Sequence, residues 1–341
     1  MHKYQHPSTL LLERGGTLVR PEFAYHTYGN PENPVVWVCH ALTANSDVLD
    51  WWAGLFGHGD YFDPARYYIV CSNVLTSCYG TTGPLSENPE TGQPYFHDYP
   101  QVTIRDMVAA HEALRQHLGI EKIHLLIGGS LGGQQAVEWS IQQPELFDNL
   151  ILIATNARHS AWGIAFNESQ RMAIQADETW LKRHPEAGDS GMRSARAIAL
   201  LSYRSYQTYV DFQTDEEFRF TDQKAVTYQL YQGAKLSRRF NAFSYYRLSE
   251  AMDSHHVGRG RGPIEQVLAQ VRARTLVIGL SSDVLFPPVE QQFLAVHIPG
   301  AQYCEIDSIY GHDGFLVETE KLTAVISAFF EGAAQTTFFT H

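Results

Sequence analysis

Short apolar runs rich in β-forming residues alternate along this chain with longer segments of helical period. The runs that predict strands are VVWVC at Val35–Cys39, YYIVC at Tyr67–Cys71, IHLLI at Ile123–Ile127, LILIA at Leu150–Ala154, TLVIG at Thr275–Gly279 and YCEI at Tyr303–Ile306. The segments that predict helices lie at about 102–118, 131–142, 287–297 and 314–331. Strands without polar positions are typical of parallel sheets, which are buried on both faces. The alternation therefore predicts an α/β fold with a mostly parallel, doubly wound sheet.

The alternation stops between about Ala161 and Pro263. This stretch contains no convincing strand run, and segments such as ESQRMAIQADETWLKR have helical spacing. A helical insertion between two strands of a sheet is expected to cover the strand ends. We therefore predict a core formed by residues 1–160 and 264–341, with a helical cap, or lid, formed by residues 161–263.

Composition excludes several classes of function. The chain has 341 residues, with 25 Lys and Arg against 37 Asp and Glu, so its net charge of −12 argues against a nucleic-acid partner. Its four cysteines form no CxxC pair, so we expect neither a metal site nor a disulfide framework. No apolar run is long enough for a membrane span, and the N-terminus lacks the pattern of a signal peptide. We expect a cytoplasmic protein that does not bind membranes.

The strongest catalytic signal is the segment IHLLIGGSLGGQQAVEWS. The predicted strand Ile123–Ile127 leads into GGSLGG at Gly128–Gly133, and a helix follows at once. This is the G-x-S-x-G pattern in the strand–turn–helix setting of a nucleophile elbow, with Ser130 as the nucleophile. The glycines allow strand and helix to pass closely at a strained turn.

A nucleophilic serine of this kind needs an acid and then a histidine later in the chain. Asp283 follows the strand TLVIG, and His312 follows the strand YCEI. The carboxyl ends of parallel strands line the crevice in which ligands bind. We therefore expect His312 to accept the proton of Ser130, while Asp283 holds the imidazole in the required orientation.

Two backbone N–H groups are expected to stabilise the oxyanion. One belongs to Leu131, next to the nucleophile, and the other to Leu42 in the loop CHALT that follows the first buried strand. His40 lies in the same loop, where we expect it to shape the loop rather than to act as a base.

The chain resembles the homoserine O-acetyltransferase family, acyl-CoA-dependent transferases with the α/β-hydrolase fold. The resemblance extends from about Phe23 to Val317, and its main blocks are AYHTYGN, CHALT, YYIVCSNVL, CYGTTGP, TIRDMV, GGSLGG, YRSYQTY, YQGAKL, AMDSHHVGRGRG, SSDVLFPP and YGHDGFLVE. Generic hydrolases do not share this ordered set of blocks.

The resemblance implies roles for individual residues. Ser130 resembles the family nucleophile, and Asp283 and His312 resemble its acid and base. Arg204, in YRS, resembles the residue that binds the homoserine carboxylate, and Asp313 resembles the one that meets the amino group. A guanidinium can hold a carboxylate with two hydrogen bonds.

The reaction implied is ping-pong transfer of an acetyl group from acetyl-CoA to L-homoserine, a step of methionine biosynthesis. It requires no bound cofactor, and the resemblance suggests a homodimer. Departures from the family pattern are Thr76-Ser77 before Cys78, Leu131 after the nucleophile and Val284 after the acid. They leave open another acyl-CoA donor, such as succinyl-CoA, and serine as acceptor. An esterase or thioesterase with the same triad is a further alternative.

Basic side chains gather near the end of the predicted cap. Residues 230–262 contain six of them against Glu250 and Asp253, a local balance of +4. Two interpretations of residues such as Arg259 and Arg261 stay open at this stage. They could attract the phosphates of CoA, or they could form salt bridges on a solvated helix face.

Overall fold

The computed structural model describes residues 1–332, and within them eight strands form one sheet. Their order across the sheet is β1 (His2–Gln5), β4 (Glu22–Tyr28), β6 (Tyr68–Ser72), β5 (Val35–Cys39), β9 (Ile123–Gly129), β10 (Phe147–Ile153), β11 (Arg274–Leu280) and β12 (Gln302–Ile306). The strands from β6 to β12 are parallel, whereas β1 and β4 pair antiparallel at one edge. The predicted mostly parallel sheet is confirmed.

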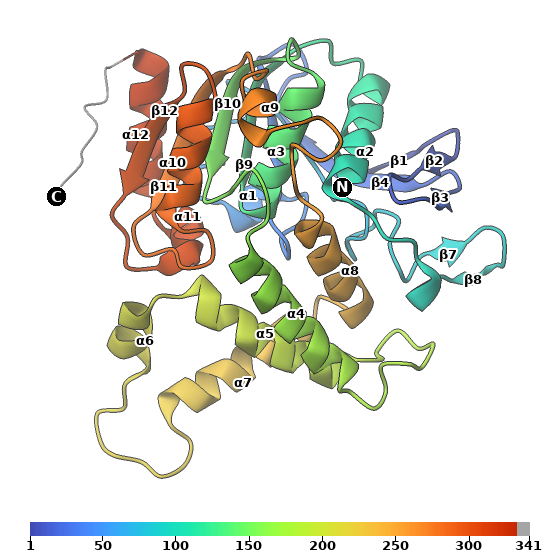
Figure 1. The fold of residues 1–341 in the computed structure, drawn as a ribbon, viewed down its shortest axis with the longest axis vertical. Coiled ribbons are helices and arrows are strands. Elements are labelled where there is room, and N and C mark those ends of the chain that lie inside the picture. The colour runs from blue at the N-terminus through green and yellow to red at the C-terminus, as the bar shows by residue number, and fades with distance from the viewer. Residues whose placement is uncertain (333–341) are drawn as a thin grey trace.

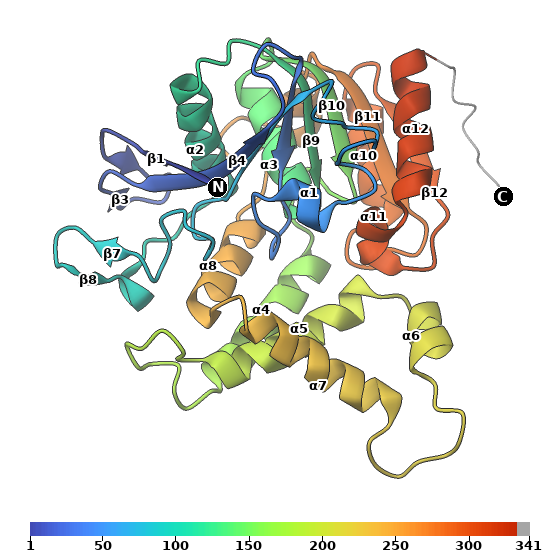
Figure 2. The same cartoon turned by 180° about the vertical axis from the view of Figure 1, so that it is seen from behind.

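Helices cover both faces of this sheet (Figures 1 and 2). One face carries α2 (Ile104–His117), α3 (Leu131–Gln142), α9 (Ile264–Leu268) and α10 (Pro288–His297), and the other carries α1 (Val48–Trp51) and α12 (Thr319–Glu331). Successive residues of a strand point to opposite faces. Trp37 of β5 accordingly packs with Trp139 of α3, while Val36 and Val38 pack with α1 and α12. Each such buried side chain contributes about 1.5–3 kcal/mol to stability.

All six predicted strands are present, with ends that differ by up to three residues. Some features of the sheet and its helices differ from the prediction. The antiparallel strands β1 and β4 were not predicted, because they contain polar positions, exposed in β1 and half-buried in β4, and so lack the apolar signal of the central strands. The helix predicted at 314–331 is divided into α11 (Gly314–Val317) and α12, because Glu318 between them is not helical, with φ −83° and ψ 46°. Small hairpins pair β2 (Leu10–Leu11) with β3 (Thr17–Leu18), and β7 (Glu87–Asn88) with β8 (Gln93–Pro94).

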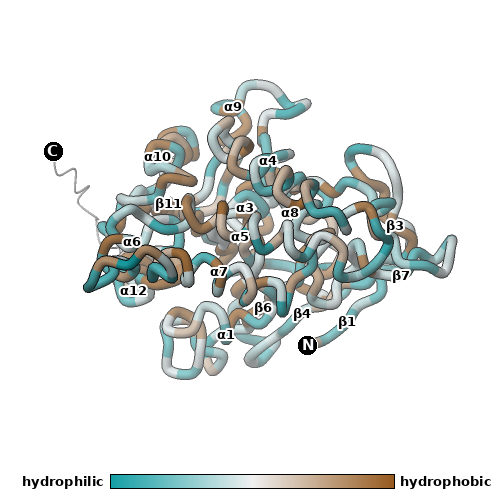
Figure 3. The backbone as a smooth tube through the Cα atoms, turned by 90° about the horizontal axis from the view of Figure 1, so that it is seen from below, coloured by the Kyte–Doolittle hydropathy of each residue, from teal (hydrophilic) through white to brown (hydrophobic). Residues whose placement is uncertain are grey.

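The chain between β10 and β11 forms helices that lie beyond the carboxyl ends of the parallel strands (Figure 1). They are α4 (Ala161–Gln175), α5 (Asp189–Tyr203), α6 (Tyr206–Gln213), α7 (Lys224–Ser237) and α8 (Ala242–Asp253). The side chains of Ser160, Ser205 and Asn241 cap the N-termini of α4, α6 and α8 by accepting backbone N–H bonds. In the view of Figure 3, hydrophobic and polar residues alternate along α6 and α7.

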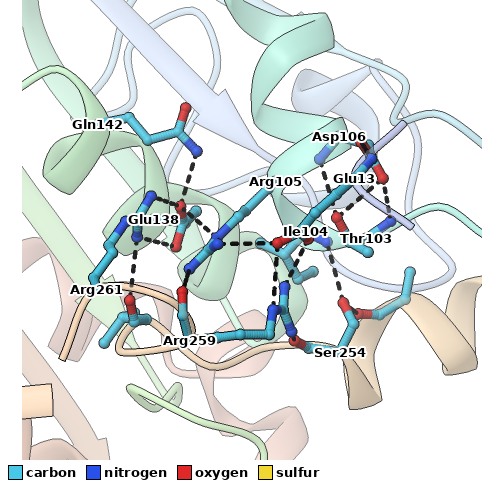
Figure 4. Close-up of polar contacts among 12 residues, drawn as sticks. Glu13, Thr103, Ile104, Arg105, Asp106, Glu138, Gln142, Ser254, Arg259 and Arg261 are labelled. Carbon is cyan, nitrogen blue, oxygen red and sulfur yellow. Dashed lines mark hydrogen bonds and ion pairs between the residues drawn. The ribbon is translucent and has the colours of Figure 1, made fainter. Parts of the chain in front are cut away.

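The connection from α8 back to the sheet is tied to the core by a cluster of ion pairs (Figure 4). Arg259 Nη2 lies 2.7 Å from Glu13 Oε2, and Arg261 Nη2 lies 2.6 Å from Glu138 Oε1. Arg105 contacts both glutamates and also donates to the carbonyl oxygen of Arg259. Both arginines of GRGRG are thus paired with carboxylates, which favours the salt-bridge interpretation over a role in phosphate attraction.

No helix within residues 1–332 is both long enough and apolar enough to cross a membrane. The tail that follows Gly332 lies outside the described residues.

Arg261→Ala should destabilise the fold. Glu138 is almost fully buried and, within residues 1–332, would retain Arg105 as its only cationic partner, so the free energy of unfolding should fall by about 1–3 kcal/mol. Urea unfolding measures this change. Arg272→Ala is the matched control, because the Arg272–Glu145 pair is exposed and should contribute less than about 1 kcal/mol. Equal losses in the two variants would contradict the structural role of Arg261.

Candidate active site

Ser130 occupies a sharp turn between β9 and α3. Its φ of 57° and ψ of −127° lie in a region that residues with a side chain rarely adopt, at a cost of about 1–3 kcal/mol. The surrounding glycines make this turn possible. A Cβ on Gly132 would lie 2.0 Å from the carbonyl oxygen of Cys39, and one on Gly128 would lie 2.3 Å from that of Gly132. The strained turn predicted from GGSLGG is therefore present.

The structure brings Ser130, His312 and Asp283 together. His312 Nε2 lies 2.8 Å from Ser130 Oγ, and His312 Nδ1 lies 2.7 Å from Asp283 Oδ2. All three residues are buried. Asp283 Oδ1 accepts hydrogen bonds from the backbone N–H groups of Leu285 and Phe286, which fix its orientation. With its proton on Nδ1, His312 can accept the hydroxyl proton of Ser130, which is the arrangement of a nucleophile, base and orienting acid.

The loop that carries His312 packs directly on the end of α5. Gly311 has a φ of 64°, and a Cβ there would lie 2.9 Å from both Ser205 N and Tyr203 O. The ring of Phe286 stacks on that of His312, with their centroids 5.1 Å apart. The backbone contact at Gly311 restricts the loop, and the Phe286 ring restricts the imidazole that the loop carries.

The two predicted oxyanion donors come from separate backbone segments. Leu131 is the first residue of α3, so its N–H has no acceptor in a preceding helical turn. Leu42 lies in the loop after β5, and its N–H makes no hydrogen bond within residues 1–332. Both residues are buried beside the elbow.

His40 shapes this loop rather than acting as a base. Its Nδ1 donates to Ala41 O at 2.8 Å, and its Nε2 accepts from the Val74 N–H at 3.0 Å. Burial lowers the pKa of His40 to about 4, so the ring is neutral and both nitrogens are occupied.

Arg204 and Asp313 form an ion pair beside His312, with Arg204 Nε 2.8 Å from Asp313 Oδ2. Burial raises the pKa of Asp313, and the guanidinium groups of Arg204 and Arg196 oppose this effect. Arg196 lies over the ring of Tyr203, with its guanidinium carbon 5.3 Å from the ring centroid. Arg196 could not be found from the sequence, because its position on α5 is that of an ordinary helix-face charge.

Another carboxyl group near the site is Glu290, at the start of α10. It lines a cleft of about 930 Å³ between α4, α9 and α10, and its Oε2 accepts from Asn156 Nδ2 at 2.8 Å. The pKa of Glu290 is raised to about 7, chiefly by burial and also by the negative charge of Asp283, against the opposing effect of the hydrogen bonds from Asn156 and Ser160.

Comparison with known proteins assigns the chain to a family. A model of the alpha/beta hydrolase fold matches residues 34–319. The homoserine O-acetyltransferase of Cyclobacterium marinum is 47% identical over 325 residues, which cover 94% of this chain and 92% of that protein. The chain belongs to the homoserine O-acetyltransferase family. The family resemblance drawn from the sequence blocks and the predicted α/β-hydrolase fold are therefore both confirmed.

Solved structures agree with this assignment. The homoserine O-acetyltransferase of Staphylococcus aureus is 30% identical with a TM-score of 0.80, over 98% of this chain and 95% of that one. Esterase E22 gives a TM-score of 0.87 at 22% identity, over 96% of this chain and 98% of that one. At that identity the esterase shares the fold alone.

Glu290→Gln should stabilise the protein at alkaline pH. The native pKa lies above the ordinary value of 4.5, so folded Glu290 binds a proton that the unfolded chain releases between about pH 4.5 and 7. Wild-type stability therefore falls as pH rises through this window. The variant does not lose this stability, because the amide that replaces the carboxyl group does not ionise. The variant should have a higher Tm than the wild type at pH 8 and a similar Tm at pH 5. The exposed Glu265→Gln is the control, and a gain independent of pH would contradict the account.

Proposed function

We propose that this protein transfers the acetyl group of acetyl-CoA to the hydroxyl of L-homoserine, which yields O-acetyl-L-homoserine and CoA for methionine biosynthesis. The observation that carries the proposal is the hydrogen-bonded series Ser130–His312–Asp283 in a chain of this family. The triad supplies a nucleophile that can hold the acetyl group between donor and acceptor.

In the first half-reaction, Ser130 Oγ attacks the thioester carbonyl while its proton moves to His312 Nε2. The oxyanion accepts hydrogen bonds from the N–H groups of Leu42 and Leu131. When the tetrahedral intermediate collapses, the C–S bond breaks and His312 returns the proton to the CoA sulfur. Ser130 is left acetylated.

In the second half-reaction, His312 accepts the proton of the homoserine hydroxyl, whose oxygen attacks the acetyl carbon. The bond to Ser130 Oγ then breaks, and His312 returns the proton to Ser130. The same imidazole thus acts twice as base and twice as acid.

Arg204 and Asp313 are proposed to hold the acceptor. The carboxylate of homoserine pairs with the guanidinium of Arg204, and its ammonium group pairs with Asp313. Without ligand the two side chains neutralise each other at 2.8 Å, so a zwitterion can replace one ion pair by two. Because Asp313 directly follows His312 in the chain, an acceptor held by this pair would have its hydroxyl near the imidazole.

We further propose that residues 161–263 act as a cap that excludes water from the acetyl-enzyme. A bound acceptor gains effective concentration over water, and a closed site prevents hydrolysis.

Acetyl-CoA would act as co-substrate rather than as a resident cofactor, and a cytoplasmic location stays a prediction from the sequence. Succinyl-CoA, serine and simple ester hydrolysis are not favoured, since relatives at 40% to 47% identity are named homoserine O-acetyltransferases.

A homodimer is proposed from an apolar surface on α6, α7 and the segment between them. Its large exposed side chains include Tyr206, Phe218, Phe220 and Leu230. Exposed apolar patches of this kind mark protein interfaces.

Light scattering tests the homodimer. The wild type should have twice the chain mass of 38.5 kDa, and the double variant Leu230→Asp with Phe220→Asp should have the mass of one chain. A monomeric wild type would contradict the proposal.

The reaction is tested by a grid of donors and acceptors. Acetyl-CoA with homoserine should release CoA at least about tenfold faster than acetyl-CoA with serine, succinyl-CoA with homoserine, or acetyl-CoA alone, because the proposed site is specific for this donor and this acceptor. The rate of each of the four combinations is measured from the free thiol of the released CoA. A rate of CoA release that does not depend on added homoserine would favour a hydrolase instead.

Arg204→Ala should weaken the acceptor half-reaction selectively. Loss of a charge-assisted hydrogen bond raises the KM for homoserine by about 10- to 100-fold. The burst of CoA released from acetyl-CoA alone should change little, because the donor half-reaction does not involve the homoserine carboxylate. An unchanged KM would remove Arg204 from the acceptor site.

A further inference from the structure

Gln135 joins the two backbone segments that carry the oxyanion donors. Its side-chain Nε2 donates to the carbonyl oxygen of Leu131 at 3.0 Å and to that of His40 at 3.3 Å. Gln135 is completely buried. We propose that Gln135 is a positioning residue that sets the spacing of the Leu42 and Leu131 N–H groups. The proposal rests on the oxyanion assignment made under the proposed function.

The orientation of the Gln135 amide is fixed by His111 on α2. Carbonyl oxygens only accept hydrogen bonds, so the NH₂ group must face His40 and Leu131. The amide oxygen then faces His111 Nε2 at 2.8 Å, which must carry the proton. Burial lowers the pKa of His111 to about 4, so the ring is neutral and holds its single proton there.

The contact between Gln135 and the His40 carbonyl is connected to the Leu42 N–H through the His40 ring. The Nδ1–H of His40 holds the Ala41 carbonyl, and in a trans peptide the N–H points away from the carbonyl. The His40 ring therefore sets the direction of the Leu42 N–H. Gln135 holds the His40 backbone against α3. The two segments are in backbone contact there, because a Cβ on Gly132 would clash with the carbonyl group of Cys39.

Distance matters because oxyanion donors act over a narrow range. They stabilise the transition state when they lie about 2.7–3.1 Å from the oxyanion, and removal of one donor lowers kcat by about 10²- to 10³-fold. A loop released from α3 keeps both N–H groups but loses their spacing. The effect should fall on kcat rather than on KM.

Gln134 provides a matched control from the next position of the same helix. It is equally buried, but its Nε2 donates to Asn156 Oδ1 at 3.0 Å on another side of α3. Gln134→Met and Gln135→Met therefore remove the same group from the same helix, and only the second frees the oxyanion loop.

The test measures acylation of Ser130 by p-nitrophenyl acetate and the binding of phenylboronic acid. In the boronate complex, Ser130 Oγ donates an electron pair to boron, its proton passes to His312, and the tetrahedral adduct places an oxygen in the oxyanion hole. Gln135→Met should lower kcat by about 10- to 100-fold with KM within about twofold, and weaken boronate binding by a similar factor. Gln134→Met should stay within about threefold of the wild type on both measures.

Two results would overturn the proposal. One is equal losses in the two variants, and the other is a loss of kcat without a loss of boronate affinity. If Gln135→Met does not fold, His111→Phe serves in its place, since it keeps an aromatic ring between Trp37 and Trp139 but removes the donor that orients the amide. It should lower kcat and boronate affinity together, and wild-type values would contradict the proposal. Ser130→Ala, which should abolish acylation, separates failure of this inference from failure of the proposed site.

Discussion

The turn between β9 and α3 is the constraint on which the rest of the site depends. Ser130 must adopt a positive φ so that its hydroxyl leaves the backbone at the carboxyl edge of the sheet. Gly128 and Gly132 permit this only because strand, helix and the β5 loop meet there in backbone contact. The same contact brings the Leu42 loop against the start of α3, where Leu131 follows Ser130. The proposed nucleophile and the proposed oxyanion donors thus depend on one packing arrangement.

The parallel sheet supplies the rest of the triad. Asp283 and His312 lie far from Ser130 in the chain, yet each follows a strand that ends at the same edge as β9. The strands bury apolar side chains on both faces, so their ends are held rigidly and the loops need only small adjustments. Gly311 illustrates such an adjustment, because its positive φ brings the His312 loop against α5. Through that contact Arg204 and Asp313, the proposed acceptor pair, lie beside the triad.

Much of the fold could be predicted because its central strands carry a signal that does not depend on context. Runs such as VVWVC have no polar position and can only be buried. The segment EFAYHTY of β4 mixes polar and apolar residues, and its place in the sheet depends on pairing with β6. The two interpretations of Arg259 could not be separated in advance, since its partner Glu13 lies 246 positions away in the sequence.

The triad could be predicted from order and position, whereas Arg204 and Asp313 required the family resemblance. Gln135 and His111 could not be found in this way. Their roles depend on α2 packing beside α3, which brings together side chains 24 residues apart. A buried amide next to an elbow has no sequence pattern of its own, and only its two carbonyl partners reveal what it holds.

Mass spectrometry of the acylated enzyme tests the central claim most directly. The wild-type protein mixed with acetyl-CoA and no acceptor should gain the mass of one acetyl group, and peptide mapping should place it on Ser130. Addition of homoserine should remove it and release O-acetylhomoserine. Acetyl transfer at the wild-type rate by Ser130→Ala, or a wild-type enzyme that turns over without Ser130 acetylation, would contradict the account.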